Sequence, residues 1–214
     1  MTDFDFPAFG PPQEFAAGTP LFHQGHRPSV VLLITSGFVK TIRGERDDDA
    51  LVSIRGAGWI LGLSPALLDR PYATSGVTAT QCSLRSLSLA AFTQKARHDP
   101  TFSARVLHLF ARQARTEEIL RAEMAVYEAQ ERLLRSIVRF VDLLDPPRRA
   151  GHVELTLPIT NRELAQYVGV STEHLSRLLS RLQGRGLLRR RRGALLLPLA
   201  RWPQLASERP AVPD

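Results

Sequence analysis

Cysteine is almost missing from this chain of 214 residues, which contains Cys82 alone. A single thiol excludes an intramolecular disulfide, and it excludes a zinc or iron–sulfur site built from several cysteines of one chain. No apolar run approaches the roughly 18 residues that suggest a membrane-spanning helix, and residues 1–5 lack the basic and apolar regions of a secretory signal. We therefore expect a cytoplasmic protein with no membrane partner.

The excess of positive over negative charge is confined to the second part of the chain. Residues 1–128 contain 13 Lys+Arg and 13 Asp+Glu, whereas residues 129–214 contain 15 Arg and 8 Asp+Glu. The excess in the second half accounts for the whole formal net charge of +7. A basic half joined to a neutral half is typical of a polyanion-binding domain attached to a domain with another task.

The stretch from Thr160 to Gly186 predicts two short helices joined by a sharp turn. Thr160 and Glu163 have the spacing of a capping box, which starts the first helix, and Gly169 permits the left-handed turn that ends it. Ser171 offers the N-cap of the second helix. Leucines then recur at helical spacing, at Leu175, Leu178, Leu179 and Leu182. This pattern is typical of a DNA-binding helix-turn-helix.

Polar side chains are concentrated over the first two turns of the second helix. An arginine can bond guanine O6 and N7, a carboxylate can accept from cytosine N4, and a hydroxyl can contact several base edges. The side chains that we expect to read bases are Thr172, Glu173, Ser176 and Arg177. The alternative is a purely structural helical hairpin with a solvated face.

Beyond the second helix the sequence predicts a wing, made of a strand, a basic turn and a strand. Leu187–Leu188 and Ala194–Leu197 are the two strands. The turn contains Arg189, Arg190, Arg191 and Arg192. Next to a recognition helix, these arginines are expected to bind phosphate in a salt-sensitive and sequence-blind way, although such runs are often only solvated turns.

The neutral half reads as many short strands between residues 15 and 90, separated by glycines. Val30–Ile34 and Phe38–Ile42 flank an evident hairpin turn, and Leu51–Ile54 and Cys82–Ser86 are further strands. Regularly spaced short strands of this kind predict an antiparallel barrel or jelly roll. The lone cysteine in the last strand is either an inert core thiol or a redox switch.

From Leu89 the periodicity becomes helical. We expect a short helix over Leu89–His98 and a long one that opens at Asp99-Pro100 and ends near Glu128. The long helix carries an apolar stripe, which predicts a coiled coil with a second copy of the chain. The alternative is that the whole stripe packs against the chain's own barrel. A further amphipathic helix over Ala129–Leu144 and a strand over Val153–Leu157 precede the helix-turn-helix.

The order of these elements predicts an α+β fold with an N-terminal antiparallel β-barrel or jelly roll, a long dimerisation helix and a C-terminal winged helix-turn-helix. We place the sensor barrel at residues 1–98, the dimerisation helix at 99–128, the DNA-binding domain at 129–202 and a Pro-rich tail at 203–214. The sequence contains no Ser-His-Asp arrangement and no phosphate-loop motif, so we expect no catalytic residue and no enzyme.

The whole order resembles the Crp/Fnr family of bacterial transcription regulators. Gly18–Gly25 and Leu32–Lys40 are similar to the opening signature of the family's cyclic-nucleotide-binding-like barrel. Ile159–Ala165 and Ser171–Arg177 are similar to its DNA-binding motif. The resemblance implies a homodimer that places two recognition helices in successive major grooves of palindromic double-stranded DNA, with RNA polymerase as a further partner.

The resemblance also implies roles for single residues. Glu173, Ser176 and Arg177 are similar to the Fnr branch, which implies a TTGAT-like half-site in which Arg177 reads guanine. Thr160, Ser171 and His174 match positions that bind phosphate in the family. We expect Arg181 and the wing arginines to bind phosphate as well.

The sensing half departs from the family's pattern. Cyclic-nucleotide binders in the family place a glutamate for the ribose hydroxyl where this chain has Leu63, and a cation for the phosphate where it has Tyr72. Arg70 lies close in sequence but out of register. These three residues mark the candidate effector pocket, and we expect neither cAMP nor an iron–sulfur cluster as a cofactor. The alternatives are a cyclic-nucleotide-regulated member of the family and a cupin-like metalloenzyme with His23 and His26 as ligands, although the chain lacks a facial metal motif.

Overall fold

The computed structural model describes residues 6, 8–44, 49–191 and 193–201, which divide into two compact units. Residues 1–115 form the first unit and residues 116–214 the second. The long helix α3 (Pro100–Val126) contributes to both units. Among the described residues, no helix combines the length and the apolar character needed to cross a membrane.

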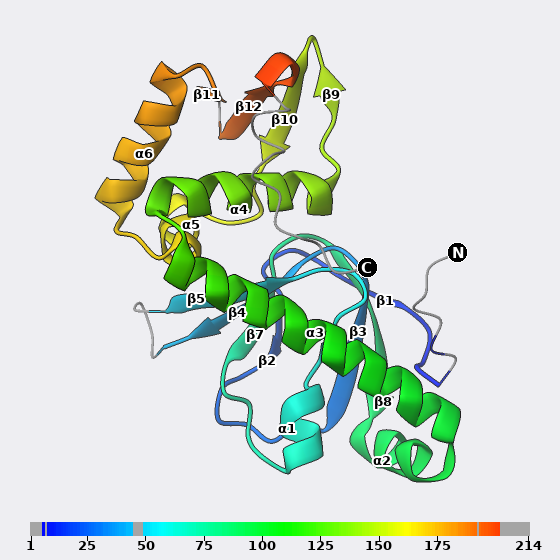
Figure 1. Cartoon of the computed structure of the whole chain (residues 1–214). Helices are drawn as coiled ribbons and strands as arrows, with labels where there is room; N and C mark the ends of the chain where they lie inside the picture. The colour runs from blue at the N-terminus through cyan, green and yellow to red at the C-terminus, as the bar shows by residue number, and fades with distance from the viewer. Residues whose placement is uncertain (1–5, 7, 45–48, 192, 202–214) are drawn as a thin grey trace. The chain divides into compact units, whose positions relative to one another are not determined.

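The first unit is an antiparallel barrel built from two four-stranded sheets (Figure 1). One sheet has the order β1-β8-β3-β6 and the other has the order β2-β7-β4-β5. The strands are β1 (Gln13–Phe15), β2 (Pro20–Phe22), β3 (Val30–Ser36), β4 (Val39–Arg43), β5 (Ala50–Arg55), β6 (Ile60–Leu61), β7 (Ser75–Thr78) and β8 (Cys82–Ser88). A turn at Gly37, whose φ of 80° suits glycine, joins β3 to β4. The two strands belong to different sheets, so the prediction that they form a hairpin is wrong.

Strand β3 is buried on both faces, which explains why its sequence is continuously apolar. Successive side chains of a strand point to opposite faces. Val31 and Leu33 belong to one buried cluster, and Leu32 and Ile34 belong to another. The second cluster includes Cys82, which is fully buried and whose Sγ donates to the Phe38 carbonyl at 3.1 Å. Burial raises the pKa of this thiol, as in an inert core cysteine.

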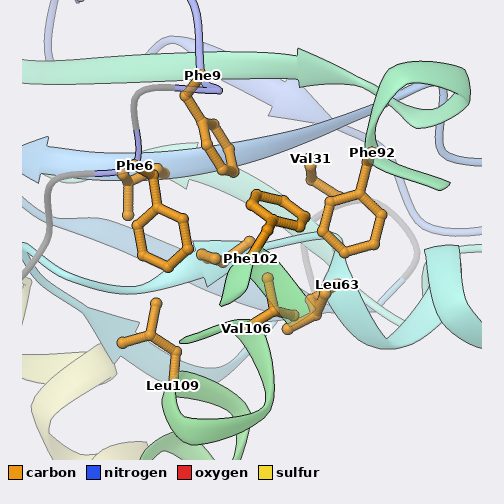
Figure 2. Packing of buried hydrophobic residues seen from close by; sticks show 10 residues of the cluster. Phe6, Phe9, Val31, Leu63, Phe92, Phe102, Val106 and Leu109 are labelled. Carbon is orange, nitrogen blue, oxygen red and sulfur yellow. The ribbon is translucent and has the colours of Figure 1, made fainter. Parts of the chain in front are cut away.

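The first of these clusters joins the barrel to its helices (Figure 2). Phe102, near the start of α3, packs edge to face against Phe6 and against Phe92 of α2 (Leu89–His98), with centroid separations of 6.0 and 5.7 Å. Val106 and Leu109, on the next turns of α3, are buried in the same cluster. The first part of the apolar stripe therefore packs within its own unit.

Further along α3 the apolar residues are not all covered. The exposed ones are Leu107, Phe110, Met124 and Val126, with relative exposures of 68, 38, 46 and 72%. The alternative in which the chain's own barrel takes up the whole stripe is therefore wrong for these side chains. The dimerisation role of the helix stays a prediction.

A short helix, α1 (Leu63–Leu68), follows β6 and was not expected from the sequence. It begins after Gly62, which has a φ of 78° and supplies no side-chain cap. Leu63 is buried, whereas Leu67 and Leu68 are exposed by 56 and 68%.

The second unit is the winged helix-turn-helix, and the predicted fold class is confirmed. Its helices are α4 (Ala129–Leu144), α5 (Asn161–Val168) and α6 (Thr172–Gly184). Its sheet has the order β11-β12-β10-β9, from β9 (Arg148–Arg149), β10 (His152–Thr156), β11 (Arg189–Arg191) and β12 (Ala194–Pro198), and η2 (Leu199–Arg201) follows (Figure 1). The apolar face of α4 is buried, and Val153 and Leu155 of β10 are buried as well.

The wing differs from the prediction because Arg189, Arg190 and Arg191 form a strand and not the turn. Arg189 pairs with Leu196, and Arg191 pairs with Ala194. Leu187, predicted as a strand residue, closes the end of α6 instead: its N–H donates to the Leu182 carbonyl at 3.0 Å. The tail at residues 203–214 lies outside the described residues.

Candidate nucleic-acid interface

Helix α5 begins at the capping box that the sequence predicts. The Thr160 hydroxyl accepts from the Glu163 N–H at 3.2 Å, and the Glu163 carboxylate accepts from the Thr160 N–H at 2.8 Å. These bonds satisfy two amides that the helix leaves without an internal partner. The face of α5 that packs into the core of the second unit consists of the buried side chains Leu164, Ala165 and Val168.

The turn between α5 and α6 depends on Gly169. Its φ is 74°, in the left-handed region that favours glycine. A Cβ atom at this position would collide with the terminal methyl of Met124. The Val170 N–H donates to the Ala165 carbonyl at 2.9 Å, which closes the end of α5. The turn is therefore tight and surrounded by side chains.

Helix α6 separates a buried face from a polar face. The Ser171 hydroxyl caps the helix by accepting from the His174 N–H at 3.2 Å. The buried side chains are Leu175, Leu178, Leu179 and Leu182. The predicted base readers, Thr172, Glu173, Ser176 and Arg177, are all exposed. Their spacing of i, i+1, i+4 and i+5 places them together on one face of the helix.

The charge of Glu173 is held at the start of this face. Hydrogen bonds from its own backbone amide and from the Ser171 hydroxyl, together with the charge of Arg177, lower the pKa of the Glu173 carboxyl below its ordinary value. The carboxylate is thus ionised at neutral pH, as an acceptor for a base amino group must be. The face offers an anionic acceptor and a cationic donor one helical turn apart.

The predicted phosphate contacts fall into two groups. The hydroxyls of Thr160 and Ser171 are engaged in helix caps, and His174 is half-buried. Thr160 and Ser171 are nevertheless exposed. The second group consists of exposed arginines, namely Arg181, Arg189, Arg190 and Arg191. Arg190 also donates to the Ser180 hydroxyl at 3.4 Å, which ties the wing to α6. Arg192 lies outside the described residues.

Two arginines of α4 that the sequence analysis did not single out hold this motif. Arg132 donates to backbone carbonyls at the ends of α3 and α5. Arg139 forms an ion pair with Glu123 of α3 at 2.7 Å and lies 3.5 Å from the hydroxyl of Tyr167 in α5. Burial alone would lower the pKa of Arg139, but its interactions with Tyr167 and Glu123 raise it above the ordinary value. The guanidinium therefore stays charged.

The candidate effector residues differ in their surroundings. Leu63 lies in the cluster between the barrel and its helices, and Arg70 is exposed. Tyr72 is 8% exposed; its ring stacks on Phe22 with 4.2 Å between centroids, and its hydroxyl donates to the Val30 carbonyl at 3.4 Å. The Phe22 ring of the same chain therefore covers the Tyr72 ring.

The histidines proposed as metal ligands lie close together but lack further donors. The rings of His23 and His26 are edge to face, 5.6 Å apart, and both residues are exposed. Within residues 6, 8–44, 49–191 and 193–201, no three His, Cys, Asp or Glu side chains gather in a way that could bind a metal ion. The cupin-like alternative gains no support.

Comparison with known proteins adds two domain matches and several relatives. Residues 12–99 match the cyclic nucleotide-binding domain, and residues 131–205 match the Crp-like helix-turn-helix domain. The "CRP-like cAMP-activated global transcriptional regulator" of Mycobacterium tuberculosis is 25% identical over 179 residues, which cover 83% of this chain and 80% of that protein. The "CRP-like protein Clp" of Xanthomonas campestris is 28% identical over 195 residues, which cover 86 and 83% of the two chains.

Solved structures share the fold. TTHB099, described as a CRP-family transcriptional regulator of Thermus thermophilus, superposes with a TM-score of 0.79 at 20% identity, covering 94% of this chain and 100% of that one. The structure of Clp, described as a c-di-GMP responsive global regulator, has a TM-score of 0.72 at 22% identity, covering 87 and 93%.

Proposed function

Because the chain belongs to the Crp/Fnr family of bacterial transcription regulators, we propose that it binds a palindromic DNA site as a homodimer through α6. The chain is a transcription regulator with a helix-turn-helix DNA-binding domain, like the relatives that it matches. The half-sites are TTGAT-like. Binding alters transcription through contact with RNA polymerase, and the protein has no catalytic activity in this proposal.

The observation that carries this proposal is the polar face of α6. Its start is fixed by the Ser171 cap and its back by four buried leucines, so the exposed side chains project from a rigid helix. Rigid presentation is what base readout requires, because a bidentate contact tolerates little displacement. Arg177 reads guanine in this proposal, and Glu173 and Ser176 read its neighbours.

The proposed dimer is supported by the exposed apolar side chains of α3. Leu107, Phe110 and Val126 are large apolar residues that this chain does not cover. A parallel helix from a second copy would remove them from water. Two-fold symmetry then sets the two recognition helices about 34 Å apart, which is one turn of DNA.

The effector is not cAMP in this proposal. The relatives respond to different nucleotides, since one is described as cAMP-activated and another as c-di-GMP responsive. In this chain the positions that would bind a ribose hydroxyl and a phosphate hold Leu63 and Tyr72, and both side chains are packed against the chain itself. Calorimetric titration with cAMP and with cGMP should therefore give no binding heat, and micromolar binding of either would contradict the proposal.

The test of DNA recognition is selection of bound duplexes from a random pool, followed by titration of the selected sequence and a shuffled sequence. Arg177→Ala should weaken binding to the selected sequence by about 1–3 kcal/mol and relax the preference for guanine. As a contrast, Arg191→Ala should weaken both duplexes alike and reduce the salt slope by about one. Equal loss on both duplexes for Arg177→Ala, or no palindrome in the selected pool, would overturn the proposal.

A further inference from the structure

Arg132 joins two helix ends in the second unit. This residue lies in the first turn of α4 and is half-buried. Its Nη1 donates to the Tyr127 carbonyl at 2.7 Å, directly after α3. Its Nε donates to the Val168 carbonyl at 2.8 Å, the last residue of α5, and its Nη2 lies 3.4 Å from the Gly169 carbonyl. One guanidinium thus contacts three backbone carbonyls.

The chemistry of these three contacts favours arginine specifically. The last carbonyls of a helix have no partner within the helix, and the helix dipole makes them a preferred place for a cation. A guanidinium presents several N–H donors in one rigid plane, so it can bond carbonyls in different directions at once. The ammonium of a lysine is a compact point charge without this fixed fork. Replacement by lysine would therefore keep the charge and lose the geometry.

Two of the three carbonyls, those of Val168 and Gly169, lie immediately before the recognition helix. Only Val170 separates Gly169 from Ser171, which is the N-cap of α6. A displacement of the Gly169 peptide is therefore passed to the start of α6 within two residues. The terminal methyl of Met124 lies beside the same glycine. The position of the polar face of α6 thus depends on where Arg132 holds the turn.

We propose that Arg132 is a positioning residue for DNA recognition, which orients α6 through the backbone carbonyls of the turn and does not itself bind DNA. The inference rests on the proposed function, because it concerns how the same helix reaches the bases. It names a side chain outside the recognition face as a determinant of sequence specificity.

The experiment compares Arg132→Gln and Arg132→Lys with the wild type in the full-length protein. Arg135→Gln is the matched control, because it removes the same charge from α4 and keeps the Arg132 side chain. Arg135 pairs with Glu131 at 3.2 Å and lies over the Tyr127 ring at 3.8 Å. Each protein is titrated at several salt concentrations with the sequence selected by the wild type and with a shuffled duplex of the same length.

Arg132→Gln should bind the selected sequence at least tenfold more weakly, while its binding to the shuffled duplex stays within threefold and its salt slope is unchanged. Arg132→Lys should recover only part of the loss, and Arg135→Gln should stay within threefold on both duplexes. Hydrogen exchange should accelerate at Gly169, Val170 and Ser171 in Arg132→Gln, with the buried part of α4 protected as in the wild type.

Undiminished specific binding by Arg132→Gln would overturn the inference. Equal loss on both duplexes with a salt slope lower by about one would overturn it too, because Arg132 would then be a phosphate contact. Full recovery in Arg132→Lys, or loss of protection throughout α4, would likewise contradict a geometric role. If the wild type selects no sequence, the proposed function fails, and that result is seen before any variant is compared.

Discussion

Replacing Glu123 by alanine should destabilise the second unit by about 3 kcal/mol. The Glu123 Oε2 lies 2.7 Å from the Arg139 Nη2, and the two side chains are 9 and 21% exposed. Removal of one partner of a buried ion pair leaves an uncompensated charge and costs about 3–5 kcal/mol. We expect the lower end of this range because Arg139 keeps some access to water and its contact with Tyr167. The buried Glu123 Oε1, which has no hydrogen-bond partner, also weakens the pair in the wild type.

Scanning calorimetry of the full chain measures this effect. For a unit of about 100 residues, 1 kcal/mol shifts Tm by about 4–8 °C, so the transition of the second unit should fall by about 12–24 °C. The matched control is the double variant Glu123→Leu/Arg139→Met, in which apolar side chains of similar volume replace the pair. It should recover most of the lost stability. A fall below about 4 °C for Glu123→Ala, or a double variant no more stable than the single one, would refute the reasoning.

Three further predictions concern single residues. Burial raises the pKa of the Cys82 thiol, so iodoacetamide should label the native protein far more slowly than a denatured sample; equal rates would contradict this. Hydrogen bonds, chiefly from Lys95, lower the pKa of Asp99, so its stabilisation is complete above the ordinary value of 3.8 and is lost as pH falls through the lower folded value. The difference in Tm between wild type and Asp99→Ala should shrink below pH 3.8, and a constant difference would exclude this linkage. Gly169→Ala should cost about 1–2 kcal/mol in a thermal melt, because φ is 74° there, and an unchanged Tm would contradict this.

The elements that the sequence predicts well are those whose ends are determined by neighbouring residues. The bounds of α2 and α4 coincide with the expected Leu89–His98 and Ala129–Leu144. Ser88 caps the first by accepting from the Ala91 N–H, and Asp145 with the prolines after it ends the second. The capping box of α5 is equally local. Signals of this kind lie within four residues of the feature that they specify.

The elements that the sequence did not predict depend on distant partners or lack a local signal. Helix α1 starts without a capping side chain and leaves Leu67 and Leu68 exposed, so no amphipathic pattern marks it. The arginines of β11 have the composition of a solvated turn, and only their pairing with β12 makes them a strand. The residue composition of this segment does not indicate that it pairs with β12.

The candidate site shows the same division. The exposed face of α6 follows from helical periodicity, so its members could be named from the sequence. The role of Arg132 could not, because the acceptor that links it to the turn is the carbonyl of Val168, 36 residues further along the chain. The sequence around an arginine on an amphipathic helix does not show whether its guanidinium bonds distant backbone carbonyls or is exposed to solvent.

The amino-terminal segment that closes the barrel lies ahead of the matched domain. The match to the cyclic nucleotide-binding domain begins at residue 12, yet Phe6 and Phe9 are each only 2% exposed. Arg85 fastens this segment by donating to the carbonyls of Phe9 and Gly10 at 2.6 and 2.8 Å. A recombinant protein trimmed at residue 12 would therefore lose the Phe6 ring that packs on Phe102, expose apolar surface there and tend to aggregate. Biosensors or chimaeras made from this barrel need the segment from Phe6 onward.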